Sequence, residues 1–185
     1  GLLPGGGGTQ RLPRLAGPSE ALKMMLTGSH VPAQKALNLG IVDSVSDNIV
    51  AESIEFIKDV AEKTDNHPKV RDFNEKMMEA RGDDKVLLEA QAMAAKGRKG
   101  QFAPGQIIKC VEAAINIDDF DEGLKKEGEY FLECLVHPQR EAMIHIFFGE
   151  RAASKISDVP KETKVMDIKK AGIIGSGTMG GGIAM

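Results

Sequence analysis

Residues 1–14 read Gly-Leu-Leu-Pro-Gly-Gly-Gly-Gly-Thr-Gln-Arg-Leu-Pro-Arg, with four consecutive glycines from Gly5 to Gly8. Such a run predicts no helix or strand interior, because glycine loses more conformational freedom on folding than other residues. It predicts a tight turn that approaches a ligand or another backbone closely, and the amides of such a turn can hold a water molecule or an oxyanion. Arg11 and Arg14 follow the turn, and solvated surface or a structural ion pair is the simpler interpretation of each than a phosphate contact.

The composition of the whole chain excludes several classes of protein. The 185 residues are 42% hydrophobic and 28% charged, which is normal for a globular protein. A net charge of -3 without a dense basic block argues against nucleic acid, and no apolar run approaches the roughly 20 residues of a membrane span. Cys110 and Cys134 lack metal-type spacing and indicate a reducing compartment. Because the chain opens in a loop and closes at a helix start, we expect it to be part of a longer protein.

Periodic apolar residues predict a series of helices beyond the glycine run. Prolines suit the first positions of several of them, and glycines suit the stops. The expected ranges are 18–27, 32–39, 48–64, 83–96, 104–115, 118–136 and 138–153. Residues 41–45 form a short strand at best, and residues 171–174 are expected to form a buried strand. Residues 154–168, rich in Lys, Ser, Asp, Pro, Glu and Thr, are typical of a linker between domains.

The segment from Gly175 to Gly180 reads Gly-Ser-Gly-Thr-Met-Gly and fits G-x-G-x-x-G. It follows an apolar strand candidate and precedes a helix start, which is the context of a dinucleotide-binding turn. There the first glycine permits a tight turn, the second lets the backbone reach a pyrophosphate, and the third allows close packing. A plain glycine-rich turn is the alternative.

No other group of residues has the spacing of a catalytic or metal site. The four histidines are scattered, so no metal ligand set is expected. His67 and His137 each precede a proline at a helix boundary, where capping or loop surface is the simple interpretation. The acidic run at residues 118–122 is read as a helix start that complements the helix dipole.

Several motifs resemble one enzyme family in order and spacing. Pro4 to Arg14 is similar to the P-G-x-G-G-T-Q-R-L segment of the crotonase (enoyl-CoA hydratase) superfamily. Leu-Thr-Gly at residues 26–28, Ala-Gln-Lys-Ala at 33–36 and Leu-Gly-Ile-Val-Asp at 39–43 follow as in that family. Residues 102–104, 146–151 and 175–184 resemble the bifunctional members, such as the α subunits of bacterial fatty-acid oxidation complexes, the mitochondrial trifunctional α subunit and the peroxisomal bifunctional enzyme.

The resemblance implies a domain organisation. The parent protein is expected to be α/β, with a crotonase-type domain and a Rossmann domain, whereas the portion present is expected to be mostly α-helical. Residues 1–153 would be the C-terminal part of the hydratase domain and 154–168 a linker. Residues 169–185 would begin the NAD-binding Rossmann domain of a 3-hydroxyacyl-CoA dehydrogenase.

The resemblance also implies an activity in fatty-acid β-oxidation. A trans-2-enoyl-CoA would be hydrated to a 3-hydroxyacyl-CoA, which NAD then oxidises to a 3-ketoacyl-CoA. The expected partners are an acyl-CoA thioester as substrate and a 3-ketoacyl-CoA thiolase β subunit. The expected location is the cytoplasm of a bacterium, or a mitochondrion or peroxisome in a eukaryote.

Few site residues carry over from the family to this chain. Gly5 matches the glycine whose amide helps to place the hydration water, and Glu150 matches an acidic position associated with substrate in bacterial members. The NAD-binding turn is Gly175, Ser176, Gly177, Thr178, Met179 and Gly180. Both catalytic glutamates and the oxyanion amides are expected before Gly1, and the dehydrogenase His-Glu pair after Met185. No complete catalytic site is therefore expected in this chain. Two alternatives to the bifunctional enzyme are an inactive helical module with at most partial coenzyme contacts and a stand-alone hydratase, of which the second is disfavoured by the context of the Gly175–Gly180 motif.

Overall fold

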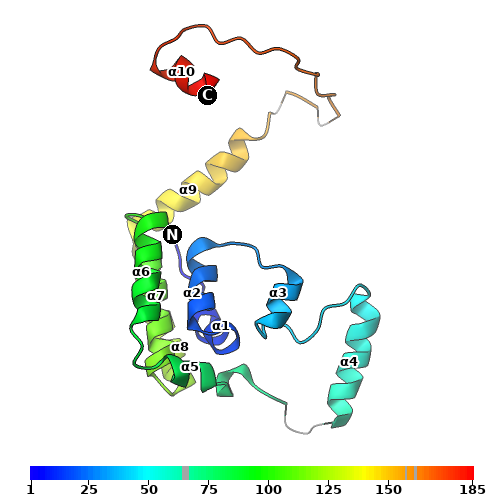
Figure 1. Ribbon diagram of the computed structural model, residues 1–185, viewed down its shortest axis with the longest axis vertical. Coiled ribbons are helices and arrows are strands. Elements are labelled where there is room, and N and C mark those ends of the chain that lie inside the picture. The colour runs from blue at the N-terminus through cyan, green and yellow to red at the C-terminus, as the bar shows by residue number, and fades with distance from the viewer. Residues whose placement is uncertain (64–66, 157, 161) are drawn as a thin grey trace. The chain divides into compact units, whose positions relative to one another are not determined.

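The computed structural model describes residues 1–63, 67–156, 158–160 and 162–185. It divides into two compact units, Gly1–Phe147 and Phe148–Met185. Within the described residues the chain forms helices and no strand (Figure 1). This confirms the prediction of a mostly α-helical chain, while the Rossmann part of the expected architecture and the domain boundaries stay predictions.

The first unit begins with two helices, α1 (Gly8–Ala16) and α2 (Pro18–Thr27), which meet at Gly17. α2 has the predicted bounds, because Pro18 suits a first helical position and Gly28 adopts a left-handed φ of +69° at the end. α1 was not predicted, because the first helix expected from the sequence was 18–27. Its residues are held as a helix by packing against α2, α7 and α8, which local sequence does not reveal.

The core of the first unit is built around α7 (Ala103–Asn116), which packs against α1, α2, α5 (Glu75–Ala80), α6 (Lys85–Gly97) and α8 (Phe120–Val136) (Figure 1). The apolar face predicted for this helix is buried. The buried residues that it contributes to the core are Ala103, Ile107, Ile108, Cys110, Val111, Ala114 and Ile115. Both cysteines, Cys110 and Cys134, are free thiols inside this core, as predicted.

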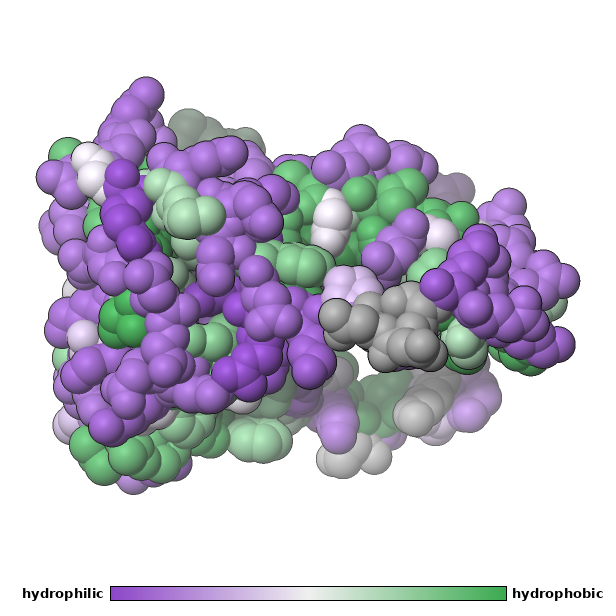
Figure 2. Space-filling view, turned by 90° about the horizontal axis from the view of Figure 1, so that it is seen from below, coloured by the Kyte–Doolittle hydropathy of each residue, from purple (hydrophilic) through white to green (hydrophobic). Residues whose placement is uncertain are grey.

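A more exposed segment of the same unit carries α3 (Ala33–Asn38), α4 (Ile49–Lys63) and the short 3-10 helix η1 (Val70–Asp72). The helix predicted over residues 48–64 is confirmed as α4, and Thr64 lies outside the described residues. The apolar face of α4 is largely exposed, with Ile57 at 64%, and apolar side chains interrupt the polar surface elsewhere too (Figure 2). α5 and η1 were not predicted, because they lie in a charged stretch without a clear apolar period.

Two strand predictions were wrong. Residues 41–45 and residues 171–174 have no strand structure, and Ile173 and Ile174 are exposed. An apolar, β-branched run becomes a strand only when another strand accepts its hydrogen bonds. No such neighbouring strand exists among the described residues.

The last helices are α9 (Pro138–Ala153), which has the predicted bounds, and α10 (Thr178–Ala184). Between them, the expected linker 154–168 contains no helix in its described residues, and residues 157 and 161 lie outside them. α10 starts at Thr178, inside the Gly175–Gly180 motif and before the position at which the sequence predicted a helix start.

Candidate functional site

The glycine run forms a turn that leads directly into α1. Gly6 and Gly7 have φ values of +67° and +86°, in the left-handed region that side chains other than glycine rarely adopt. The Gly8 amide approaches the Gly5 carbonyl oxygen at 3.4 Å, which closes the turn, and Gly7 is the N-cap residue of α1. The predicted tight turn is therefore present.

The carboxylate of Glu127, on α8, occupies the start of α1. Its Oε1 accepts a hydrogen bond from the Gly7 amide at 2.6 Å. Its Oε2 accepts from the Thr9 amide at 3.1 Å and from Thr9 Oγ1 at 2.5 Å. Glu127 is only 4% exposed, so its negative charge is placed inside the protein at the positive end of a helix.

This carboxylate changes the sequence-based interpretation of the turn. The amides of Gly7 and Thr9 are bound by protein and do not point toward a ligand, contrary to the reading that any amide of the turn could hold an oxyanion. Gly5 is exposed, and among the residues that the structure describes no group accepts a hydrogen bond from its amide. Gly6 is exposed too, and its amide has no acceptor among the same residues. The assignment of the hydration water to the Gly5 amide therefore stays a prediction of the family resemblance.

A single face of α8 holds the N-terminal segment. Gly123, Glu127 and Phe131 follow one another at steps of four residues, which places them on one side of a helix. A Cβ added at Gly123 would lie 2.5 Å from Oε1 of the buried Gln10, and one added at Gly5 would lie 3.3 Å from the Phe131 ring. The sequence pattern identified Phe131 as apolar but missed Glu127. The only sequence feature that could have indicated Glu127 is its spacing of four residues from Gly123 and from Phe131, which places it on the same face of the helix.

Gln10 links the N-terminal segment to α7, the central helix of the core, by a hydrogen bond. Its side chain is fully buried, and its Nε2 donates to the backbone carbonyl of Cys110 on α7 at 2.9 Å and to Thr9 Oγ1 at 3.2 Å. Burial raises the pKa of the Cys110 thiol to about 12. The thiol therefore stays protonated at neutral pH and packs as a small apolar group.

The side chains of the two arginines that follow the turn are hydrogen-bonded to backbone carbonyls of the same segment. Arg11 donates to the carbonyl of Gly6 at 2.6 Å, and Arg14 donates to the carbonyl of Gln10 at 2.8 Å. Both guanidinium groups lie over the Phe120 ring, at 5.6 and 5.0 Å from its centroid. Arg14 is 2% exposed, and burial lowers the pKa of its guanidinium. The interpretation of Arg14 as solvated surface or as a structural ion pair was wrong, because its side chain is buried and makes no ion pair among the described residues. Its contacts are the Gln10 carbonyl and the Phe120 ring, and a buried side chain of this kind does not reach a free phosphate.

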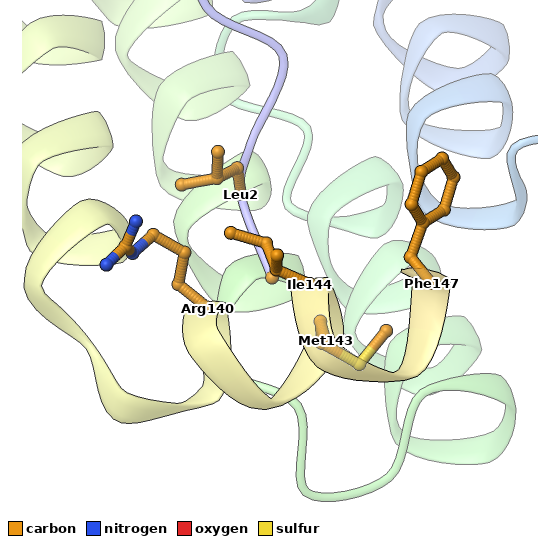
Figure 3. A pocket seen from close by; sticks show the side chains of 6 residues that line it. Leu2, Arg140, Met143, Ile144 and Phe147 are labelled. Atoms are coloured by element: carbon orange, nitrogen blue, oxygen red, sulfur yellow. The ribbon is translucent and has the colours of Figure 1, made fainter. Parts of the chain in front are cut away.

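An apolar pocket of about 290 Å³ lies between the N-terminal segment and α9 (Figure 3). Leu2 comes from the segment just before the turn, and Arg140, Met143, Ile144 and Phe147 come from α9. Since Leu2 precedes Gly5 by only three residues, the pocket is close in sequence to the exposed amide. Its lining is mostly hydrocarbon and suits an apolar ligand.

The second glycine motif lies in the unit Phe148–Met185. Gly175 has a φ of +109°, and a Cβ added at Gly180 would lie 1.9 Å from its carbonyl oxygen. At Gly177, the N-cap of α10, an added Cβ would meet nothing within 4 Å. A side chain at Gly180 would clash with the nearby Gly175 carbonyl, so this position requires glycine. The backbone at Gly177 is open, as a pyrophosphate contact requires.

The other residues singled out from the sequence, Glu150, His137 and Asp119, lie at or near helix ends. Glu150 is exposed near the end of α9, in the second unit, and its carbonyl accepts from the Ser154 amide at 3.1 Å. His137 ends α8, and its Nδ1 accepts from the Gln139 amide at 3.2 Å, which confirms a role at a helix boundary. Asp119 caps α8 through the amides of Asp121 and Glu122, as expected for the acidic run.

Two general features concern the described part of the chain only. No group of three or more His, Cys, Asp or Glu residues there is placed to hold a metal ion. None of its helices combines the length and the apolar character that a membrane crossing requires.

The family of the chain follows from its sequence match. Residues 1–105 match the family model for enoyl-CoA hydratase/isomerase, and they contain the glycine turn, α1 and α2. The chain therefore belongs to the enoyl-CoA hydratase/isomerase family.

The individual relatives of the chain are named as subunits of a fatty acid oxidation complex. The chain is similar to the fatty acid oxidation complex subunit alpha of Shewanella sp. strain MR-4 and of Shewanella oneidensis, each 37% identical over the whole chain. The corresponding subunit of Shewanella baltica strain OS155 is 36% identical over the same extent. In each case the chain spans only 26% of the length of the relative.

Proposed function

We propose that the protein acts in fatty-acid β-oxidation as an enoyl-CoA hydratase, converting a trans-2-enoyl-CoA to a 3-hydroxyacyl-CoA. The observation that carries the proposal is the turn at Gly5–Gly8, whose exposed Gly5 amide stands at the start of a helix anchored by Glu127. Membership of the enoyl-CoA hydratase/isomerase family supports it, as does the name of the relatives, subunits of a fatty acid oxidation complex.

In this proposal the Gly5 amide donates a hydrogen bond to the attacking water. Hydration adds the oxygen of that water to C3 of the enoyl thioester and a proton to C2, with no change in redox state. The family resemblance assigns the acid and the base to two glutamates that precede the position of Gly1, so the reaction requires a protein that carries them. The pocket at Leu2, Met143 and Phe147 is apolar and suits part of the acyl chain.

A second activity, NAD-dependent oxidation of the 3-hydroxyacyl-CoA, is proposed for the longer protein. It is supported by the turn from Gly175 to Gly180, where the open backbone at Gly177 and the close approach at Gly180 fit a bound pyrophosphate. A bound NAD would supply the acceptor for the hydride that leaves C3, and the proton of the 3-hydroxyl group would pass to the His-Glu pair that the family resemblance places after Met185. A thiolase β subunit is the partner that we propose, because the relatives are named as subunits of a complex. A cytoplasmic location stays a prediction.

A coupled absorbance assay tests both steps. We expect the full-length protein to remove the enoyl-thioester absorbance of crotonyl-CoA, and to form NADH once NAD is added. Loss of the absorbance without NADH would favour the alternative of a stand-alone hydratase. No loss of the absorbance would overturn the proposed hydratase function.

The 185-residue chain by itself is a separate case. If the family pattern holds, it lacks the two glutamates, and loss of a positioned acid-base group costs on the order of 10²–10⁴ in rate. We therefore expect this chain alone to be an inactive helical module in the same assay. Turnover close to that of the full-length protein would refute the assignment of acid and base to residues before Gly1.

A further inference from the structure

We propose that Glu127 is a positioning residue for hydration: its carboxylate fixes the backbone of the glycine turn so that the Gly5 amide points at the attacking water. The inference rests on the proposed hydratase function. It assigns a role to a side chain that lies 120 residues after the turn and is not itself placed to contact substrate.

The turn requires an external anchor because of its composition. Four successive glycines have more accessible backbone conformations than any other tetrapeptide segment of the chain, and two of them are held at positive φ. Without a partner, the amides of Gly7 and Thr9 would be free donors at a helix start. Both donate to the Glu127 carboxylate, so one side chain fixes the orientation of two nearby peptide groups, Gly6–Gly7 and Gly8–Thr9, in the segment that follows Gly5.

The Glu127 carboxylate accepts charge-assisted hydrogen bonds from Gly7 and Thr9. Bonds to an ionised carboxylate are shorter and stronger than bonds between neutral groups, and the Thr9 Oγ1 contact is 2.5 Å. Glu127 is nearly inaccessible to water, so solvent does not replace the turn as its partner. The hydroxyl of Thr9 thus supplies the third donor that a buried carboxylate needs.

The same helix also fixes Gly5 itself. Phe131 lies one turn after Glu127 on α8, and a Cβ added at Gly5 would approach its ring at 3.3 Å. The ring covers one side of Gly5 while the carboxylate holds the residues that follow it. A shift of the Glu127 contacts would therefore displace the Gly5 amide relative to the substrate.

The expected consequence is a loss of turnover more than of substrate binding. A misplacement of about 1 Å in a catalytic group can cost on the order of 10² in rate. We expect Thr9→Val, which removes the hydroxyl donor without changing the volume much, to lower the kcat of hydration by about 10- to 100-fold. The KM for the enoyl-CoA should stay within roughly threefold, because the substrate contacts lie elsewhere.

The test compares four variants of the full-length protein, assayed for hydration and for dehydrogenation. Glu127→Gln should behave like Thr9→Val or worse, since an amide presents a donor to the donors of the turn. Thr9→Ser keeps the hydroxyl and should restore most of kcat. Glu129→Gln is the matched control, because Glu129 lies on α8 but pairs with Lys126 at the surface.

The outcomes separate the two proposals. Lower kcat in Thr9→Val and Glu127→Gln, with unchanged KM, unchanged dehydrogenation and rescue by Thr9→Ser, supports the positioning role. If the wild type hydrates and Thr9→Val hydrates equally well, the positioning role is overturned and the hydratase function stands. If kcat and dehydrogenation fall and KM rises in Thr9→Val, Glu127→Gln and Thr9→Ser alike, Glu127 is structural only. A wild type without hydratase activity overturns both proposals.

Discussion

Thr9 Oγ1 and Glu127 Oε2 are 2.5 Å apart although 118 residues separate them in the chain. The contact joins the first helix of the structure to α8 and lies beside the only exposed amide that we assign to the reaction. It is one part of a continuous interface, in which one face of α8 packs along the N-terminal segment from Gly5 to Gln10.

Gly123→Ala should destabilise the chain. The added Cβ would lie 2.5 Å from Oε1 of Gln10, whose side chain is fully buried and cannot move aside without losing its bond to α7. Overpacking of this kind costs about 1–3 kcal/mol. The free energy of unfolding in urea measures the effect.

Gly128→Ala is the matched control on the same helix. An added Cβ there meets nothing within 4 Å, so alanine should stabilise the helix by about 0.5–1 kcal/mol relative to glycine. The two substitutions are chemically identical and should have opposite signs. Equal stability of both variants would mean that Gln10 is not held against α8.

Gly177→Val in the full-length protein should weaken NAD binding and dehydrogenation while leaving hydration nearly unchanged. A branched side chain blocks the approach of the backbone to the pyrophosphate. Gly180→Ala should have a similar effect for a different reason, because its Cβ would lie 1.9 Å from the Gly175 carbonyl oxygen. Calorimetric titration with NADH should give at least about a tenfold loss of affinity, or 1.4 kcal/mol.

Gly182→Ala serves as the control for the second turn. Its added Cβ meets no atom within 4 Å, so NADH affinity should stay at the wild-type value. If Gly180→Ala binds NADH as well as Gly182→Ala, the segment is a plain glycine turn. Equal loss of hydration and dehydrogenation in Gly177→Val would instead indicate misfolding.

Stability should fall with rising pH above the ordinary thiol range. Burial raises the pKa of the Cys110 thiol from 9.0 to about 12 in the folded protein. Between these values the unfolded chain loses the thiol proton and the folded chain keeps it. The free energy of unfolding should therefore decrease by up to about 1.4 kcal/mol per pH unit from this group, and little of this loss occurs more than about one pH unit below the ordinary thiol pKa of 9.0.

Urea unfolding at several values between pH 9 and pH 11 measures that slope. Cys110→Ala removes the titrating group, so its slope should be shallower than that of the wild type, while the Cys134 thiol, whose pKa is also raised by burial, contributes to both slopes. Identical slopes would show that the thiol does not remain protonated in the folded state.

Much of the fold could be predicted from local patterns. Helices such as α2 and α9 have the predicted bounds, because Pro18 and Pro138 suit helix starts and the apolar residues recur at helical spacing. α1 could not be predicted in this way. Its first residue is Gly8 and it contains Pro13, so its stability depends on tertiary contacts and on the Glu127 carboxylate.

The site was predictable only in part. The motif located Gly5 and the glycines of the second turn, since glycine patterns reflect local backbone requirements. Glu127 was missed because its partners lie more than 100 residues away, and a single glutamate on a helix is usually solvated. The strand predicted at residues 171–174 failed for a related reason, because strand formation depends on a neighbour that local sequence does not specify.

A double-mutant cycle between Thr9→Val and Glu127→Gln, measured as unfolding free energies of this chain in urea, tests the central claim most directly. The claim is that α8 anchors the glycine turn through this pair. Because a hydrogen bond to a charged group contributes about 1.5–3 kcal/mol, we predict a coupling free energy in that range. Additive effects, within about 0.3–0.5 kcal/mol, would contradict the account, since they would mean that Thr9 and Glu127 stabilise the chain independently.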